Sequence, residues 1–279
     1  SLEAYLEAVV PSEMPASYEE QALMAQAVCA RTYAVCQIQE NSLEKYGADV
    51  DDSVNYQVYN NFPADKRTSK AVQDTKGQIL CQNGEPITAY YFSTSAGRTS
   101  TDEIWGADRS AAYLKSVECD FDQNMPWSSW SVEIPWETLE NRSGNLEGSG
   151  EFIGLQVIKK NISGAVTGME IVTENKSIQL EGEYEIRQFL SPAGCLITEK
   201  DGSIVNGSNL LPSAYFELNV KSGKAVQIQG KGYGHGVGMS QNGANEMARE
   251  GYGWQEILNY FFKDITLEMV GNNLSKRET

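Results

Sequence analysis

Residues 2–15 have the sequence LEAYLEAVVPSEMP, and residues 20–36 have the sequence EQALMAQAVCARTYAVC. In both segments the apolar residues recur at intervals of three and four, which predicts two helices. The recurring residues of the second segment are small, as at Ala22, Ala25 and Cys29, so this helix is expected to pack closely against its neighbours. We therefore expect residues 20–36 to form a core helix of the fold.

The connection between these two helices contains two prolines. Pro11 is expected to end the first helix, because a proline inside a helix removes a backbone hydrogen bond. Residues 12–15 (SEMP) would then form a tight turn at the entrance of the second helix. Ser17 and Glu20 have the spacing of a capping box, which predicts that Ser17 caps that helix.

The rest of the chain changes its period twice. Residues 66–76 have a helical pattern, and Asn83-Gly84 between two apolar runs predicts a β-hairpin. From about residue 127 to residue 229, apolar and polar residues alternate, as expected for strands with one buried face. After Gly238 the helical spacing returns. This order predicts an α+β fold, in which a helical core carries an inserted, mainly antiparallel β module.

The points at which the period changes suggest the boundaries of these parts. We expect one domain over residues 1–270, with helical and loop parts at about 1–125 and 230–270 and a β-rich insertion at about 126–229. Residues 271–279 are expected to form a flexible, solvated tail.

The composition is strongly acidic. The chain has 279 residues and a formal net charge of −16. A surface of this sign repels phosphate backbones and polyanionic membrane faces, which argues against nucleic acid as a partner. Uncharged glycans and peptides remain open as ligands. No apolar run reaches the roughly 18 residues of a transmembrane helix. Because the chain starts at Ser1 within a helical pattern, we expect a leader or membrane anchor to precede it.

Three separated blocks of sequence carry a resemblance to a known family. The first consists of residues 9–15 (VVPSEMP) and residues 25–34 (AQAVCARTYA), the second of residues 91–99 (YFSTSAGRT), and the third of residues 232–244 (GYGHGVGMSQNGA). In this order the blocks resemble the signature of the stage II sporulation protein D and amidase-enhancer family. The resemblance extends from residue 2 to about residue 262.

The resemblance implies an activity on bacterial cell wall. It implies a lytic transglycosylase that cleaves the β-1,4 bond between N-acetylmuramic acid and N-acetylglucosamine in glycan strands stripped of stem peptides. The product would end in a 1,6-anhydro sugar. The domain of residues 1–270 would then be a single catalytic domain. By carry-over from the Glu-Met-Pro motif, Glu13 would be its catalytic residue.

The residues around Glu13 agree with this role. An acid that protonates a glycosidic oxygen needs a raised pKa, and apolar surroundings such as Met14 and the flanking prolines favour one. A transglycosylase needs no second carboxylate, because the 6-hydroxyl of the sugar attacks. No second acidic residue of the matched blocks has an obvious partner position. Asp102 and Glu103 are the nearest candidates, and we do not assign them this part. The alternative for Glu13 is a structural carboxylate at a helix start.

Arg31 lies within an otherwise small and apolar helix, where a buried guanidinium needs a partner. It could orient Glu13 in one network or hold a sugar carbonyl or lactate carboxylate, and a structural ion pair is the equal alternative. The other matched blocks supply further candidates for substrate binding or support, for which an architectural role is the alternative: Ser93, Ser95, Tyr233, His235, Ser240 and Gln241.

We predict no metal and no cofactor. His235 is the single histidine, and no Cys-x-x-Cys or His-x-x-x-His spacing accompanies it. Some relatives place Cys and His in the loop that corresponds to residues 51–59, which here has the sequence DDSVNYQVY, so no structural zinc is expected there. The glycines around His235 predict a tight loop and lack the strand–helix unit of a dinucleotide site. Ser95 lacks the elbow motif of a serine hydrolase.

The partners are implied by the resemblance alone. They are peptidoglycan glycan strands, a stem-peptide amidase (stage II sporulation protein P) and a membrane scaffold (stage II sporulation protein M). The protein would act outside the cytoplasm, between the mother cell and forespore membranes, in septal and engulfment peptidoglycan remodelling. Two alternatives remain: a non-catalytic, glycan-binding amidase enhancer, and a lysozyme-like hydrolase that uses water and a second carboxylate.

Overall fold

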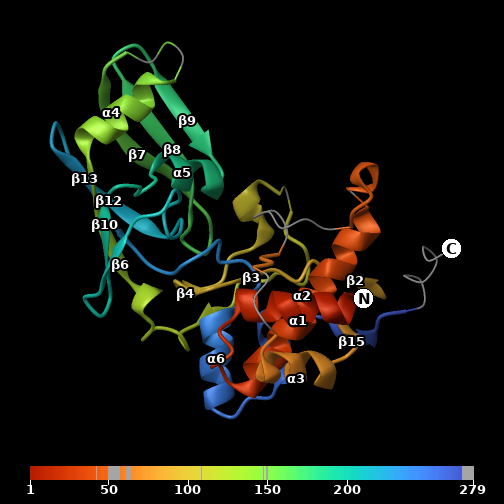
Figure 1. Ribbon diagram of the computed structural model, residues 1–279. Coiled ribbons are helices and arrows are strands. Elements are labelled where there is room, and N and C mark those ends of the chain that lie inside the picture. The colour runs from red at the N-terminus through yellow and green to blue at the C-terminus, as the bar shows by residue number, and fades with distance from the viewer. Residues whose placement is uncertain are drawn as a thin grey trace. The chain divides into compact units, whose positions relative to one another are not determined.

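The computed structural model describes residues 1–41, 43–49, 57–60, 64–107, 109–146, 148 and 150–271. The chain divides into two compact units. The terminal unit comprises Ser1–Tyr91 and Gly243–Thr279, and the inserted unit comprises Phe92–Asn242. The chain passes from one unit to the other within β3 (Tyr91–Phe92) and within α6 (Gln241–Arg249) (Figure 1).

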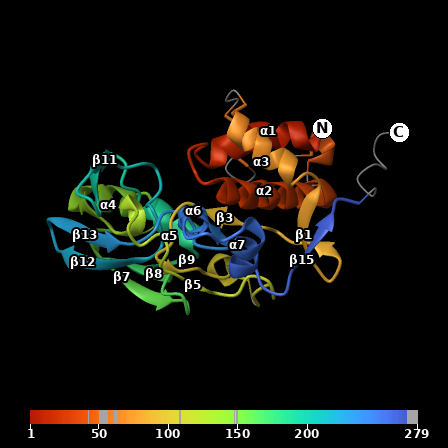
Figure 2. The same ribbon diagram turned by 90° about the horizontal axis from the view of Figure 1, so that it is seen from below.

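The terminal unit is built around one central helix, α2 (Glu20–Glu40). This helix packs against α1 (Leu2–Glu13), α3 (Lys66–Asp74), α7 (Trp254–Phe261) and β1 (Gln78–Gln82). Figure 2 shows α1 and α3 on one side of α2 and α7 on the other. The small side chains of α2 are buried, as its sequence predicts, because only small residues let so many neighbours approach one helix.

A small antiparallel sheet completes the terminal unit. Its central strand β1 pairs with β2 (Glu85–Pro86) on one edge and with β15 (Thr266–Met269) on the other. Asn83 and Gly84 both have positive φ, as a two-residue hairpin turn requires, so the predicted hairpin is confirmed. We expected residues 87–93 to form the returning strand, but β2 precedes that run. The strand β15 lies in a segment for which we predicted no strand.

The prediction that Pro11 ends the first helix is wrong. Pro11 lies inside α1, which continues to Glu13. The turn after the proline is held because the Met14 amide donates to the Val10 carbonyl oxygen (2.9 Å). The Ser12 hydroxyl also donates to a backbone carbonyl one turn earlier (2.8 Å). Glu13, which we expected in a turn, is therefore held at the end of a helix.

The predicted capping box at Ser17 is also wrong. Glu19 is the residue before the first turn of α2, and its side chain makes no capping hydrogen bond. The segment before α2 is held by a tertiary contact instead, since Arg67 of α3 donates to the carbonyl oxygens of Ala16 and Tyr18 (2.6 and 2.8 Å).

The inserted unit contains two larger antiparallel sheets. The first has the strand order β11-β10-β6-β13-β12, and the second has the order β7-β8-β9. Their strands are β6 (Trp130–Pro135), β10 (Leu196–Glu199), β11 (Ile204–Asn206), β12 (Phe216–Lys221), β13 (Ala225–Gly230), β7 (Phe152–Lys160), β8 (Val166–Thr173) and β9 (Ser177–Glu181). Buried and exposed residues alternate along β6, as its period of two predicts. The predicted α+β class and its antiparallel β module are confirmed.

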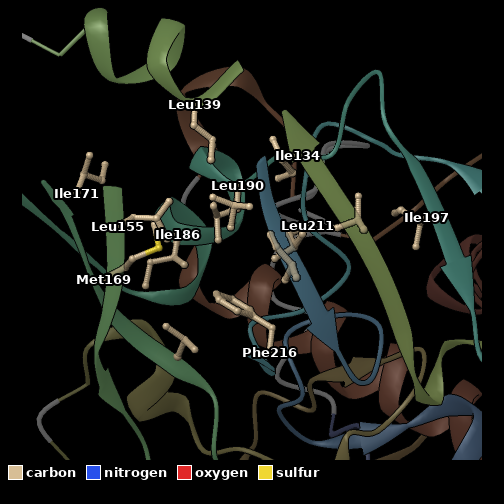
Figure 3. Packing of buried hydrophobic residues seen from close by; sticks show 14 of the residues in the cluster. Ile134, Leu139, Leu155, Met169, Ile171, Ile186, Leu190, Ile197, Leu211 and Phe216 are labelled. Carbon is tan, nitrogen blue, oxygen red and sulfur yellow. The ribbon is translucent and has the colours of Figure 1, made fainter. Parts of the chain in front are cut away.

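One hydrophobic core joins these two sheets. Leu155 and Ile171 of the β7–β8 pair and Ile134 of β6 belong to one cluster of buried residues with the helix α5 (Glu183–Phe189), and Figure 3 shows part of this cluster. The helix contributes Ile186 to the same cluster. The inserted unit thus has a core of its own.

The remaining described elements are short: α4 (Trp136–Gly144), β4 (Gly97–Arg98), β5 (Glu118–Cys119), β14 (Met239–Ser240), η1 (Glu44–Tyr46), η2 (Asp102–Trp105) and η3 (Pro126–Ser128). All five cysteines lie in the described ranges and are free thiols. No helix in the described part of the chain combines the length and apolar character that crossing a bilayer needs. The single domain of residues 1–270 stays a prediction. Of the predicted tail, residues 272–279 lie outside the described residues.

Gly230 allows a tryptophan to pack in the five-stranded sheet. Gly230 of β13 is paired with Trp130 of β6, and a Cβ at Gly230 would lie 2.0 Å from the indole ring. The ring cannot move aside freely, because Trp130 is buried and its Nε1 donates to the Gly232 carbonyl oxygen (2.9 Å).

We expect Gly230→Ala to lower the free energy of unfolding of the inserted unit by about 1–3 kcal/mol, the cost of an overpacked core. Urea denaturation followed by tryptophan fluorescence measures it. Gly154→Ala in β7 is the matched control, since a Cβ there meets no atom within 4 Å. Equal stabilities of the two variants would contradict the packing argument.

Candidate active site

Glu13 is the last residue of α1, and two hydrogen-bond donors converge on its carboxyl group. The Val58 amide donates to Glu13 Oε1 (2.7 Å), and the Tyr91 hydroxyl donates to the same side chain. Glu13 therefore does not sit at a helix start, as the structural alternative supposed. All three residues belong to the terminal unit.

The surroundings of Glu13 favour its neutral form. Burial raises the pKa of the Glu13 carboxyl above its ordinary value, and the hydrogen bonds from Val58 and Tyr91 oppose part of this rise. The position at the C-terminal end of a helix also disfavours a negative charge, because the helix dipole is negative there. The pKa of Glu13 is thus shifted in the direction that a general acid requires.

The terminal unit contains two pairs of contacting tyrosine rings. Tyr5 and Tyr59 stack with their centroids 5.8 Å apart and their planes at 6°. Tyr33 and Tyr90 meet edge to face at 6.0 Å. Burial raises the pKa of Tyr5 to about 12, and the charge of Glu13 contributes, which places the Tyr5 hydroxyl near the acid. Such rings offer apolar faces to sugar C–H groups and hydroxyls to sugar oxygens.

A buried amide connects two of the tyrosines. Gln57 is 1% exposed and donates from Nε2 to the Ala30 carbonyl oxygen (3.2 Å) and to the Tyr91 hydroxyl oxygen (3.1 Å). Its Oε1 accepts from the Tyr5 hydroxyl (3.2 Å). Sequence analysis did not assign Tyr5, Tyr33, Gln57 or Tyr59 to the site. The available signal was the place of Tyr33 in the first matched block.

Arg31 is fully buried and is held by structural partners. Its Nε and Nη2 donate to the two carboxylate oxygens of Glu3 (2.9 and 2.7 Å). The other N–H groups donate hydrogen bonds to the Val72 and Gln78 carbonyl oxygens and to the Thr75 hydroxyl (3.0, 3.2 and 3.4 Å). A guanidinium has five N–H donors, and these five contacts use all of them. The contacts are those of the structural ion pair, and no donor is left for Glu13 or a sugar.

In the inserted unit, the second and third sequence blocks lie side by side. Thr94 and Tyr233 exchange two backbone hydrogen bonds (3.1 and 2.9 Å), and the Ser100 amide donates to the Gly236 carbonyl oxygen (2.6 Å). Gly232 has positive φ, and a Cβ there would lie 2.8 Å from the Thr94 carbonyl oxygen. The predicted tight glycine loop is confirmed, and its glycines allow this close backbone pairing.

A buried aspartate, which the sequence analysis did not single out, ties the same two blocks. Asp122 Oδ2 accepts from the Ser95 amide and from the Ser240 hydroxyl (2.6 Å each). Burial raises the pKa of Asp122, and these two bonds oppose the rise. The Ser95 hydroxyl accepts from the Gly97 amide (2.9 Å). Ser95 and Ser240 are thus engaged inside the unit, which favours support over direct sugar contact.

Aromatic residues of the inserted unit lie near its histidine. His235 Nδ1 accepts from the Val237 amide (3.0 Å), and the imidazole contacts Trp105 with centroids 5.1 Å apart. Tyr233 contacts Trp127 at 4.7 Å. Trp105 and Tyr233 are 39% and 38% exposed, so both rings are partly open to a ligand.

The other predicted candidates are placed as follows. The Ser93 hydroxyl lies 3.1 Å from that of Thr94, and Gln241 is buried at the start of α6. Asp102 and Glu103 are in the inserted unit, where Asp102 accepts from the Ala111 amide (3.2 Å). A sugar-binding role for Ser93 and Gln241 stays a prediction, and Asp102 and Glu103 were assigned no role.

Residues that could hold a metal ion do not cluster in the described part of the chain: no group of three or more His, Cys, Asp or Glu side chains meets there. The prediction of no structural zinc concerned the loop of residues 51–59, of which residues 51–56 lie outside the described residues.

Comparison with known proteins separates the same two units. Residues 1–81 match the family described as Stage II sporulation protein, and residues 107–238 match a domain of unknown function (DUF8618). The first match lies in the terminal unit and the second in the inserted unit.

Three curated relatives match nearly the whole chain. It is 32% identical to stage II sporulation protein D of Bacillus subtilis (strain 168) and of Bacillus amyloliquefaciens, over 99% of this chain and 76% of each relative. It is 30% identical to the amidase enhancer of Bacillus subtilis (strain 168), over 94% of this chain and 40% of that protein. The chain thus spans well under half of the amidase enhancer.

Breaking the Arg31 ion pair tests its structural role. We expect Glu3→Gln to lower the free energy of unfolding by about 3–5 kcal/mol, because it leaves a buried guanidinium without its counter-charge. Urea denaturation followed by circular dichroism measures the change. Glu7→Gln is the control on the same helix, since Glu7 accepts a single hydrogen bond from Gln73 (2.8 Å). Unchanged stability of Glu3→Gln would contradict the structural role.

The raised pKa of Glu13 predicts a pH-dependent stability difference. A carboxyl whose folded pKa lies above its unfolded pKa makes the protein less stable as pH rises through that window. Glu13→Gln keeps an acceptor for Val58 and cannot ionise. We therefore expect this variant to gain stability over the wild type as pH rises through the window, and the gain to vanish below it. Urea denaturation at several pH values measures it, and a gain that grows as pH falls would contradict the assignment.

Proposed function

The chain belongs to the stage II sporulation protein D family, and from this premise we propose that it is a peptidoglycan lytic transglycosylase. Its substrate would be the β-1,4 bond between N-acetylmuramic acid and N-acetylglucosamine in glycan strands free of stem peptides. The observation that carries the proposal is the half-buried Glu13 carboxyl, whose pKa is raised and which accepts hydrogen bonds from Val58 and Tyr91.

The proposed reaction needs one carboxyl group that acts twice. Protonated Glu13 gives its proton to the glycosidic oxygen as the bond from that oxygen to C1 of muramic acid breaks. The resulting carboxylate takes the proton of the C6 hydroxyl of the same sugar, whose oxygen bonds to C1. Glu13 returns to its acid form, no water is consumed, and the product ends in a 1,6-anhydro ring. Val58 and Tyr91 stabilise the carboxylate between these two steps.

Aromatic surfaces in each unit suit a glycan ligand. In the terminal unit the stacked rings of Tyr5 and Tyr59 lie near the acid. In the inserted unit Trp105 and Tyr233 are partly exposed. We propose that both sets contact sugar rings through their faces, and that His235 assists in the inserted unit.

A second candidate function is a non-catalytic amidase enhancer. It is favoured by the relative of that name, which is 30% identical over 94% of this chain. In that case the tyrosines would bind glycan and Glu13 would have no chemical role. In either case we propose an extracytoplasmic site of action, with a stem-peptide amidase (stage II sporulation protein P) and a membrane scaffold (stage II sporulation protein M) as partners in sporulation.

Amidase-stripped glycan strands, analysed by mass spectrometry after incubation, distinguish the two functions. We expect fragments one water lighter than hydrolysis products, and a loss of about 100-fold or more in rate for Glu13→Gln. The rate should also fall as pH rises through the raised pKa of Glu13, since the proton to be donated is then lost. Glu7→Gln is the control with unchanged turnover.

The outcomes separate the candidates. Intact glycan with the wild type, together with glycan binding that survives Glu13→Gln, would replace the transglycosylase by the enhancer. Products with a reducing muramic acid end would instead indicate a hydrolase that uses water.

A further inference from the structure

The buried amide of Gln57 has one orientation only. The Ala30 carbonyl oxygen can accept a hydrogen bond and cannot donate one, so the amide atom that lies 3.2 Å from it must be the NH₂ group. The other amide atom is then the oxygen, and the Tyr5 hydroxyl at 3.2 Å must donate to it. A backbone carbonyl in α2 therefore sets the direction of the amide.

The orientation of this amide determines the direction of the next hydrogen bond. The NH₂ group of Gln57 also lies 3.1 Å from the Tyr91 hydroxyl oxygen, which must accept. A hydroxyl that accepts there keeps its own proton for a different acceptor. The Glu13 carboxyl is that acceptor. The hydrogen bonds therefore have one direction. Tyr5 donates to Gln57, Gln57 donates to Tyr91, and Tyr91 donates to Glu13.

We propose that Gln57 is a positioning residue that holds the Tyr91 hydroxyl as a permanent donor to Glu13. The inference deepens the proposed function and rests on it for its catalytic meaning. A fixed donor stabilises the carboxylate that exists between the two proton transfers, whereas burial favours the protonated acid. Gln57 polarises the Tyr91 hydroxyl and so strengthens this donor. It touches neither the sugar nor Glu13 itself and acts through Tyr91.

The test measures the state of Glu13 without using turnover. The stability difference between each protein and its Glu13→Gln derivative is followed against pH by urea denaturation. The difference stops changing above the folded-state pKa of Glu13, and the pH at which it levels off is taken as the midpoint of Glu13 ionisation in the folded state. The backgrounds are wild type, Tyr91→Phe, Gln57→Met and the double variant. We expect the midpoint to rise by about one pH unit in Tyr91→Phe, since a hydrogen bond to a charged group is lost.

The result that identifies Gln57 as acting through Tyr91 is non-additivity. We expect Gln57→Met to raise the midpoint by about 0.3–1 pH unit when Tyr91 is present, and to leave it unchanged in the Tyr91→Phe background. Equal shifts in both backgrounds would overturn the proposal. A loss of stability by Gln57→Met with no shift of the midpoint would overturn it too, because a purely structural residue predicts that outcome.

Two further variants serve as a control and as a substitute for Gln57→Met. Gln73→Met makes the same substitution at an exposed position of α3 and is expected to leave the midpoint unchanged. Tyr5→Phe removes the donor to Gln57 Oε1 without altering Gln57, so it serves if Gln57→Met does not fold. We expect a smaller rise of the midpoint in Tyr5→Phe, abolished by Tyr91→Phe, and an undiminished rise would overturn the proposal.

The inference and the proposed function fail separately. If glycan is not cleaved while the midpoints move as expected, the hydrogen-bond arrangement stands and the transglycosylase assignment is lost. If glycan is cleaved through Glu13 while the midpoint ignores Gln57, the enzyme stands and Gln57 has no positioning role.

Discussion

The terminal unit depends on a charge buried at its centre. Arg31 carries its guanidinium from α2 into a site with no exposure to solvent. Glu3 of α1 neutralises its charge there, and the carbonyl oxygens of Val72 and Gln78 accept hydrogen bonds from its other N–H groups. An uncompensated charge there would cost several kcal/mol, so the four segments are held together or not formed at all. Glu13 lies at the other end of α1. The ion pair therefore fixes the helix that carries the proposed acid.

Around Glu13 the protein balances two opposing effects on one carboxyl group. Burial and the helix end favour the neutral acid, whereas Val58 and Tyr91 favour the carboxylate. A group that must first give and then take a proton needs both states within reach. Such a site is expected to cost stability, because an ionised carboxyl there is only partly compensated. The Ala30 carbonyl oxygen of α2 fixes the orientation of the Gln57 amide, which in turn donates to the Tyr91 hydroxyl. The hydrogen bond that favours the carboxylate is therefore set by the fold.

The inserted unit follows a different principle. Its two motif blocks are joined mainly by their backbones, through Thr94 and Tyr233, and by one buried carboxylate, Asp122. Glycines bring the strands closer than any side chain would permit. The unit has its own core and matches its own family, which agrees with a separately folded module that presents aromatic rings. Its partly exposed Trp105 and Tyr233 are the residues that we propose to contact sugar rings.

By itself the sequence determined the features that depend on near neighbours: the helical and strand periods, the Asn83-Gly84 turn, the glycine loop around His235 and, through its motif, the interest of Glu13. The tertiary structure alone decided the partners. Glu3 for Arg31, Gln57 for Tyr91 and Asp122 for Ser240 are distant in the chain, and no spacing rule connects them. It also decided that α1 continues past Pro11, because contacts after the proline outweigh its local preference to end a helix. Local patterns encode which elements form, whereas the pairing of buried charges and donors exists only once those elements pack.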